Sequence, residues 1–174
     1  QQIKQVEIEE LLERKPIVLD EGSIREQLVN QVILITGAAG SIGSELTRQI
    51  LCYRPAKMIL FDQAETPLYD LELELKEKYH FYEYATIVGD VSDEQKMQYV
   101  FETFRPTIVY HAAAYKHVPL MENNPDEAIR TNISGTRITA EMAHQYEAGQ
   151  FVLISTDKAV NPRSIMGEIG RAHV

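Results

Sequence analysis

The sequence predicts an α/β protein in which a doubly wound parallel sheet carries helices on both faces. Strand-like and helix-like segments alternate along the chain from Val32 onward. The strand-like segments are apolar on both faces, as in parallel sheets that are covered by helices on two sides. A glycine-rich turn follows the first strand and opens a helix, which is typical of the Rossmann fold.

Each element follows from its local pattern. Short β-branched runs predict strands at Val32–Thr36, Met58–Asp62, Tyr84–Asp90, Thr107–Ala114 and Phe151–Thr156. Helical periodicity predicts helices at Ile42–Tyr53, Thr66–Tyr79 and Pro125–Tyr146, with a further helix that ends near Phe104. Ser92 and Gln95 have the spacing of a capping box for that further helix. We expect a Rossmann fold that is C-terminally truncated after its fifth strand.

Composition excludes several classes of function. The 174 residues, 44% of them hydrophobic, fit one globular domain. The net charge of −9 argues against a nucleic-acid partner but leaves small anions open. Cys52 is the only cysteine, so we expect no disulfide within the chain. We also expect no membrane contact by this chain, because no apolar run approaches the roughly 20 residues that span a bilayer.

The turn "TGAAGSIG" predicts a dinucleotide site. Its glycines allow a tight turn and let the backbone approach a pyrophosphate, whose charge then meets the first N–H groups of the helix. The predicted cofactor contacts in this turn are Gly37, Gly40, Ser41, Ile42 and Gly43.

Three other strand ends are shaped for the same ligand. Asp62 ends the second strand, where a carboxylate accepts hydrogen bonds from the adenosine ribose and repels a 2′-phosphate, so we expect NAD and regard NADP as the lesser alternative. A distant arginine could still hold that phosphate. The remaining predicted cofactor contacts are Asp90, Val91, Ala112, Ala113 and Ser155. The competing interpretation is that these glycines and alanines serve turns and packing alone.

The loop after the fifth strand places Thr156, Asp157 and Lys158 at the same edge of the sheet. An aspartate–lysine pair on a loop is commonly a solvated surface pair, but this position faces the expected nicotinamide. Lys116 and His117 are either diphosphate or sugar contacts or plainly exposed residues. His111 is expected to be a packed, hydrogen-bonded histidine, and no histidine spacing indicates a metal site.

Longer motifs resemble a known family. "TGAAGSIGSEL", "HAAAYKHVPLME", "TNISGT" and "VLISTDKAVNP" resemble the CapD-like nucleotide-sugar 4,6-dehydratases of bacterial polysaccharide biosynthesis, which belong to the extended short-chain dehydrogenase/reductase superfamily. The resemblance implies a UDP-sugar substrate, UDP-N-acetylglucosamine above all. It implies an internal redox cycle in which hydride leaves sugar C4, water is lost across C5 and C6, and the hydride returns to C6.

The resemblance also implies roles for individual residues. Lys158 is the base at C5, Asp157 protonates the departing C6 hydroxyl, and Asn161 is a substrate contact. A lysine base needs a lowered pKa and an aspartic acid donor a raised one, and burial under the substrate shifts each in that direction. Lys116 would lower the pKa of Lys158 further but would also favour the ionised form of Asp157, and the sequence leaves that competition open.

Two positions depart from the superfamily pattern. Met166 stands where the superfamily has a tyrosine that takes the C4 hydroxyl proton, as in the large membrane-anchored branch, which leaves Thr156 and Asp157 as the proton route. Gly170 stands where a lysine anchors the nicotinamide ribose.

The ends of the chain predict three segments. Residues 1–31 read as a helix and linker that enter the domain, and they resemble the linker after a membrane-anchored half. The parent is therefore expected to be an inner-membrane protein with this part at the cytoplasmic face. Residues 32–167 form the NAD-binding domain. Residues 168–174, "EIGRAHV", lack an amphipathic helical pattern and back-translate to a sequencing-adapter sequence, so we expect an artefactual tail; a divergent or engineered tail is the alternative.

The function expected of the parent is UDP-N-acetylglucosamine 4,6-dehydration, with this chain by itself inactive. A nucleotide-sugar 4-epimerase or reductase is the second hypothesis, although such an enzyme needs a tyrosine at the position of Met166 more than a dehydratase of this branch does. A non-catalytic NAD-sensing module is the third. The sequence leaves open whether the protein forms a homo-oligomer.

Overall fold

The computed structural model describes residues 20–156 and 160–171. Within them, strands and helices alternate as the sequence predicts. The strands are β1 (Val32–Thr36), β2 (Lys57–Asp62), β3 (Tyr84–Val88), β4 (Ile108–His111) and β5 (Gln150–Leu153). The main helices are α2 (Glu21–Leu28), α3 (Ser41–Leu51), α4 (Glu65–Glu77), α5 (Glu94–Phe104), α8 (Thr136–Gln145) and α9 (Ile165–Arg171).

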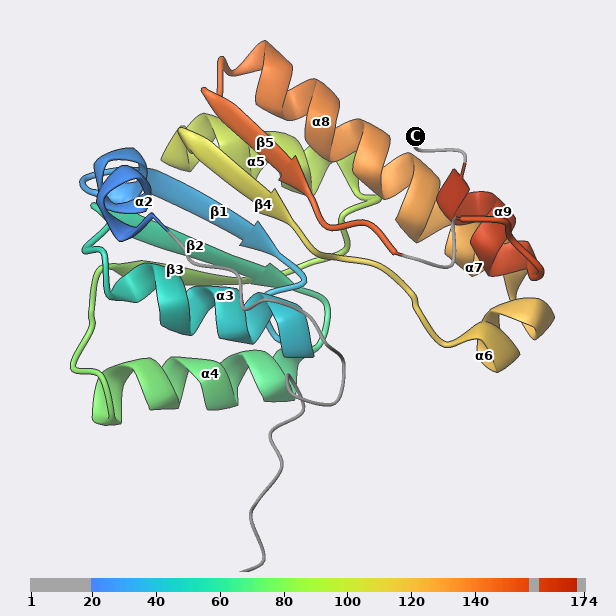
Figure 1. Ribbon diagram of the computed structural model, residues 1–174, viewed down its shortest axis with the longest axis horizontal. Helices are drawn as coiled ribbons and strands as arrows, with labels where there is room; N and C mark the ends of the chain where they lie inside the picture. The colour runs from blue at the N-terminus through green and yellow to red at the C-terminus, as the bar shows by residue number, and fades with distance from the viewer. Residues whose placement is uncertain (1–19, 157–159, 172–174) are drawn as a thin grey trace, which may run out of the picture.

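The strands form one parallel five-stranded sheet in the order β3-β2-β1-β4-β5. This order confirms the doubly wound fold, with β1 at the centre. Helices α3 and α4 cover one face of the sheet and α5 and α8 the other (Figure 1). The helices α6 (Val118–Asn123), α7 (Pro125–Ala128) and α9 gather beyond the carboxyl ends of the strands (Figure 1).

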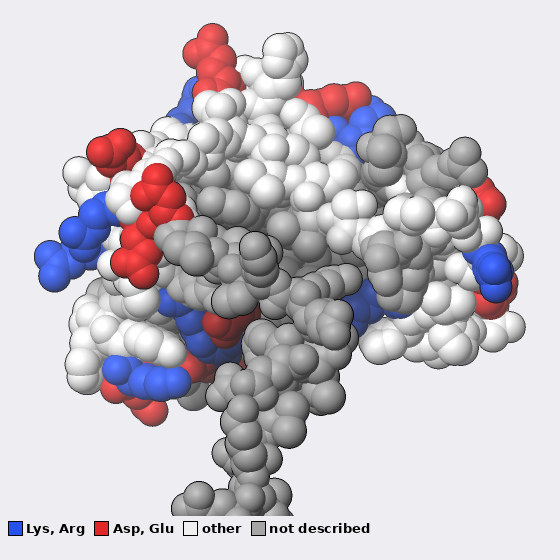
Figure 2. All heavy atoms as spheres, in the orientation of Figure 1, with Lys and Arg blue, Asp and Glu red and all other residues white. Residues whose placement is uncertain are grey.

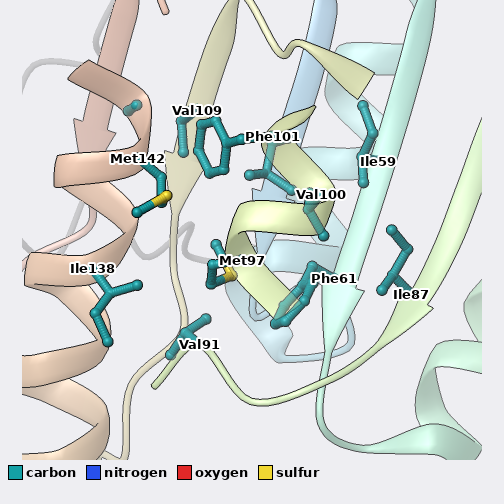
Figure 3. Close-up of a cluster of buried hydrophobic side chains, with 12 residues drawn as sticks. Ile59, Phe61, Ile87, Val91, Met97, Val100, Phe101, Val109, Ile138 and Met142 are labelled. Carbon is teal, nitrogen blue, oxygen red and sulfur yellow. The ribbon is translucent and has the colours of Figure 1, made fainter. Parts of the chain in front are cut away.

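Alternate residues of the central strands fill two separate cores. Ile33 and Ile35 of β1 pack toward α3 and α4, with Leu68 and Leu75 of α4 fully buried against them. Leu34 faces the other way into the core that Figure 3 shows, which is made by Phe61, Met97, Phe101, Val109 and Met142 among others. Both faces of the sheet are therefore buried, as the apolar runs predict.

The predicted helix Pro125–Tyr146 contains a segment that the sequence does not indicate. Between α7 and α8 the backbone forms a π-helix, η1 (Ile129–Gly135). Gly135 allows this segment to pack tightly, because a Cβ there would lie 2.6 Å from Cγ2 of Val91. The π-helix carries Thr131 and Asn132, both of which are buried.

The capping prediction at the start of α5 is wrong. Asp93, not Ser92, is the N-cap, and its carboxylate accepts a hydrogen bond from the Lys96 N–H at 3.0 Å. Ser92 instead donates from its N–H and its hydroxyl to Oδ1 of Asp90, both at 2.8 Å. Aspartate is as good an N-cap residue as serine. Ser92 is not available for capping because it donates its hydrogen bonds to the carboxylate of Asp90.

Residues 168–171 are helical, although "EIGRAHV" lacks an amphipathic helical pattern; residues 172–174 lie outside the described residues. Helix α9 continues through Glu168 to Arg171, and Ile169 is buried against Met121 and Met166. A short helix needs only a few apolar contacts, so Ile169 suffices without a wider amphipathic pattern. The proposed domain boundaries at residues 31 and 167 stay predictions.

Charged side chains of both signs are interspersed on the face that Figure 2 shows. No helix in the described part of the chain is long and apolar enough to cross a membrane.

Candidate functional site

Two neighbouring cavities open at the carboxyl ends of the strands. The first, of about 240 Å³, is lined by residues that follow β1, β2, β3 and β4. The second, of about 370 Å³, is lined by residues after β4 and β5 and from α9. Residues 112–116 line both cavities, so the two adjoin along the sheet edge, and together they are called the depression.

The structure brings most of the predicted site residues to this depression. The first cavity contains Gly37, Gly40, Asp62, Asp90, Val91, Ala112, Ala113, Lys116 and His117. The second contains Ile42, Ala112, Ala113, Lys116, Ser155, Thr156 and Met166. Ser41, Gly43 and Asn161 do not line either cavity, and Asn161 is exposed with a φ of +50°. Asp157 and Lys158 lie outside the described residues.

Glycine is needed at the three positions of the turn for different physical reasons. Gly37 has a φ of +67°, and a Cβ there would lie 2.7 Å from the backbone of Ala112. Gly43 is buried in α3, where a Cβ would come 2.1 Å from the Gly37 carbonyl oxygen. A Cβ at Gly40 would meet only the Gly37 carbonyl oxygen, at 3.2 Å. Gly37 and Gly43 therefore build the turn, and Gly40 leaves the space in front of the α3 N-terminus open.

Asp62 joins the turn to the end of β2. Its carboxylate accepts hydrogen bonds from the N–H groups of Ala39 and Ala64, both at 2.9 Å, and the residue is only 9% exposed. Each carboxylate oxygen can accept more than one hydrogen bond. Asp62 is therefore fixed in orientation and still able to bind a hydroxyl in the first cavity.

Asp90 is oriented by two neighbours at the other end of the first cavity. Ser92 holds one carboxylate oxygen, and the Arg130 guanidinium lies 3.3 Å from the other. Because Arg130 is half exposed and also pairs with Glu127 at 2.8 Å, its contact with Asp90 is one that a ligand group can replace.

The loop after β4 crosses the depression. The backbone of Tyr115 exchanges two hydrogen bonds with the side-chain amide of Asn132, at 2.8 and 3.0 Å. Lys116 extends to the Gly-rich turn, where its Nζ lies 3.3 Å from the Ser41 hydroxyl. His117 is exposed at the start of α6.

His111 is a packed histidine, as predicted. It is 1% exposed, with Nδ1 at 2.7 Å from the Thr36 hydroxyl and Nε2 at 3.0 Å from the Thr136 hydroxyl. Among the described residues there is no group of three histidine, cysteine, aspartate or glutamate side chains placed to hold a metal ion.

Met166 lies where the second cavity meets a small apolar cluster. It is 3% exposed and packs with Met121, Ala128 and Ile169. Its helix is fixed at the N-terminus, where the Glu122 carboxylate accepts a hydrogen bond from Ile165 N–H at 2.8 Å. Gly170, on the same helix, lines the second cavity too.

Sequence reasoning missed three residues that build the site. Glu122 and Asn132 lie inside the quoted motifs and act by positioning α9 and Tyr115. Thr131 lines the first cavity and is 5% exposed, and its Oγ1 has no hydrogen-bond partner among the residues that the structure describes. An unpaired buried hydroxyl is unfavourable unless a ligand satisfies it. Only the π-helical backbone reveals that Thr131 faces the cavity.

The chain is similar to known proteins of polysaccharide biosynthesis. A family model described as polysaccharide biosynthesis protein matches residues 33–173. The capsular polysaccharide biosynthesis protein CapD of Staphylococcus aureus is 48% identical over 170 residues, 97% of this chain but only 28% of that protein. A UDP-N-acetylglucosamine 4,6-dehydratase (inverting) of Campylobacter jejuni is 34% identical over 136 residues, which are 78% of this chain and 39% of the enzyme.

A solved structure shows the same architecture with ligands. The Bordetella bronchiseptica enzyme WbmG, in complex with NAD and UDP, superposes with a TM-score of 0.67 at 25% identity, over 80% of this chain and 48% of that one. The family match covers most of the chain and the fold agrees with it. The chain therefore belongs to the polysaccharide biosynthesis protein family, with CapD among its relatives.

Proposed function

We propose that the chain is the NAD-binding part of a UDP-N-acetylglucosamine 4,6-dehydratase that acts in polysaccharide biosynthesis at the cytoplasmic face of a membrane. The observation that supports the proposal is the pair of adjoining cavities, of which the first is lined by Gly40 and Asp62 and the second by Thr156. The C. jejuni dehydratase and the NAD complex of WbmG support the choice of reaction and cofactor.

The residues of the depression fit a dinucleotide. The open space beside Gly40 suits a pyrophosphate, and the fixed carboxylate of Asp62 suits a ribose diol. Among the described residues that line the two cavities, arginine is absent, which favours NAD over NADP.

The chemistry needs a hydride acceptor, and a nicotinamide held by the residues of the first cavity would supply it for the hydride that leaves sugar C4 and comes back to C6. The protein handles the protons. Thr156 and Asp157 remove the C4 hydroxyl proton, since Met166 at the second cavity has no titratable group. Lys158 takes the C5 proton, and Asp157 protonates the C6 hydroxyl as it leaves. When hydride reaches C6, C5 takes up a proton again, from Lys158 or from water.

The first test is cofactor binding by this chain. We expect NADH to bind, as shown by its fluorescence on titration, and NADPH to bind at least tenfold more weakly. Gly40→Ala should abolish NADH binding and lower the melting temperature only slightly, because its Cβ enters the ligand space at an allowed backbone angle and meets only the Gly37 carbonyl oxygen, at 3.2 Å. A chain that binds neither nucleotide contradicts the proposal.

The second test is turnover in a longer chain. Residues 20–167 replace the matching segment of S. aureus CapD, and the product from UDP-N-acetylglucosamine is identified by mass spectrometry and NMR. A 4-keto-6-deoxy sugar is expected, and Asp157→Asn or Lys158→Ala should lower its rate by at least about 100-fold. A C4 epimer would favour the epimerase hypothesis, and unchanged rates in both variants would favour a sensing module.

A further inference from the structure

The side chains of Gln63 and Tyr115 meet across the depression. Nε2 of Gln63 donates a hydrogen bond to the Tyr115 hydroxyl at 3.2 Å, and both residues line the first cavity. Gln63 directly follows β2, and Tyr115 follows β4. The contact therefore joins two loops that are 52 residues apart in the chain.

The strand order determines what this contact passes over. β2 and β4 are not neighbours, because β1 lies between them in the sheet. Two adjacent strand spacings amount to about 10 Å, so the two side chains must reach toward each other across the end of β1. The segment that follows β1 is the Gly-rich turn at Gly37 and Gly40, which lines the same cavity.

One side of the contact is firmly anchored. Asn132 is 8% exposed and holds the Tyr115 backbone by its N–H and its carbonyl oxygen. The tyrosine ring therefore starts from a fixed point. Gln63 is exposed and can swing away, so the contact can open from the Gln63 side.

We propose that Gln63 and Tyr115 form a clasp that closes over the dinucleotide and slows its release. The inference depends on the proposed function, because only that reaction requires the dinucleotide to stay bound between two hydride transfers. Hydride that leaves sugar C4 must come back to C6 of the same sugar, and loss of the dinucleotide between the two transfers would strand the sugar as a 4-keto compound. A closed path above the Gly-rich turn prevents that loss.

The clasp predicts faster exchange of the cofactor when the hydrogen bond is removed. The contact is already formed without ligand, so it must open both for entry and for exit. Tyr115→Phe removes only the hydroxyl and should raise the NADH dissociation rate constant about 3- to 10-fold, the effect of one hydrogen bond. The association rate constant should rise or stay equal.

The measurement is stopped-flow displacement of bound NADH by excess NAD, followed by NADH fluorescence. Gln63→Leu removes the other partner and should raise the NADH dissociation rate constant by a similar factor. The rate constant of the double variant should be no more than about twofold above that of either single variant, because the same hydrogen bond is lost in all three. Tyr69→Phe, an exposed tyrosine on α4, is the matched control and should leave the rate unchanged.

The outcomes separate the clasp from the proposed function. If the unaltered chain does not bind NADH, both are overturned. If it binds NADH and the dissociation rates of Tyr115→Phe and Gln63→Leu stay within twofold of the unaltered chain, the clasp alone is overturned. A lower melting temperature of the ligand-free variants with unchanged rates also overturns it, because the contact would then only brace two loops.

Discussion

Individual residues of the glycine motif have separate functions that the motif itself does not distinguish. Gly37 needs its positive φ and Gly43 needs its lack of a side chain, both for packing within the protein. Gly40 alone leaves space on the cavity side. The sequence predicts the motif because spacing and context are local, but it cannot say which glycine faces a ligand, since that depends on the approach of Ala112 from β4.

Thr131 illustrates a residue-scale cost that a ligand can offset. Thr131→Val keeps the shape and removes the unpaired hydroxyl, so we expect the free energy of unfolding to rise by about 1 kcal/mol in the absence of NADH. NADH affinity should fall about 3- to 10-fold if the hydroxyl meets the cofactor. Chemical denaturation and fluorescence titration measure the two effects.

The matched control is Thr139→Val, in which a hydroxyl that is also fully buried has a partner. Thr139 donates to the Gly135 carbonyl oxygen at 2.7 Å, so its loss should lower the free energy of unfolding by about 1 kcal/mol. Equal effects of the two substitutions would show that the Thr131 hydroxyl is not unpaired in solution.

At the scale of elements, helices α3 and α4 are joined by an ion pair outside the site. Nε and Nη2 of Arg48 donate to the Glu74 carboxylate at 2.8–3.2 Å, with the side chains 31% and 23% exposed. The hydrogen bonds from Arg48 lower the pKa of Glu74, against the opposing effect of burial, and Lys78 lowers it further.

This pair predicts a pH-dependent contribution to stability. A carboxylate whose pKa is lowered on folding stabilises the fold above its unfolded pKa, near 4.3, and that contribution disappears as the pH falls through the lower folded value. Glu74→Gln should therefore cost about 1 kcal/mol at pH 7 and less below pH 4, measured by urea denaturation.

The control for this change is Glu77→Gln, an exposed position at the end of the same helix. It should leave the stability within about 0.5 kcal/mol at both pH values. A cost of Glu74→Gln that is the same at pH 7 and pH 3 would mean that shape and packing, not charge, determine the effect.

The π-helix η1 is the element that sequence reasoning could not find. The helical periodicity over residues 125–146 is real, and the backbone stays helical over residues 125–145, but an inserted residue leaves no sign in composition. Such insertions are common at functional sites because they turn side chains toward a ligand. Here the insertion brings Thr131 to the first cavity and Asn132 to the loop after β4.

For the whole molecule, the sequence predicts the sheet because each strand is an apolar run with a turn or helix after it. The strand ends then share one edge, which is why Asp62, Asp90 and Thr156 were expected together. What the sequence could not supply are contacts across the sheet edge, such as Gln63 with Tyr115 or Lys116 with Ser41. These depend on side-chain reach between segments that local patterns treat separately.

The sheet has an edge at β5, which within the described residues pairs only with β4. Val152 on this strand is 36% exposed. An edge strand with apolar side chains favours pairing between molecules, and a lysine there opposes it. We expect Val152→Lys to raise the concentration at which the chain associates several-fold, measured by sedimentation velocity.

Val29→Lys makes the same change at 37% exposure, next to α2 and away from the sheet edge. It should leave association as it is in the unaltered chain. If both lysines reduce association equally, then general charge and not the β5 edge controls it.

The central position of β1 has a consequence for how the chain acquires its shape during synthesis. Ile33 pairs with Ile108, so the ribosome must add some 75 residues before β1 gains its second neighbour. Until α8 emerges, Leu34 and Phe61 have only α5 to cover them. The nascent chain thus passes through a stage in which one face of the sheet is only partly covered. At that stage it exposes the most apolar surface that a chaperone could bind.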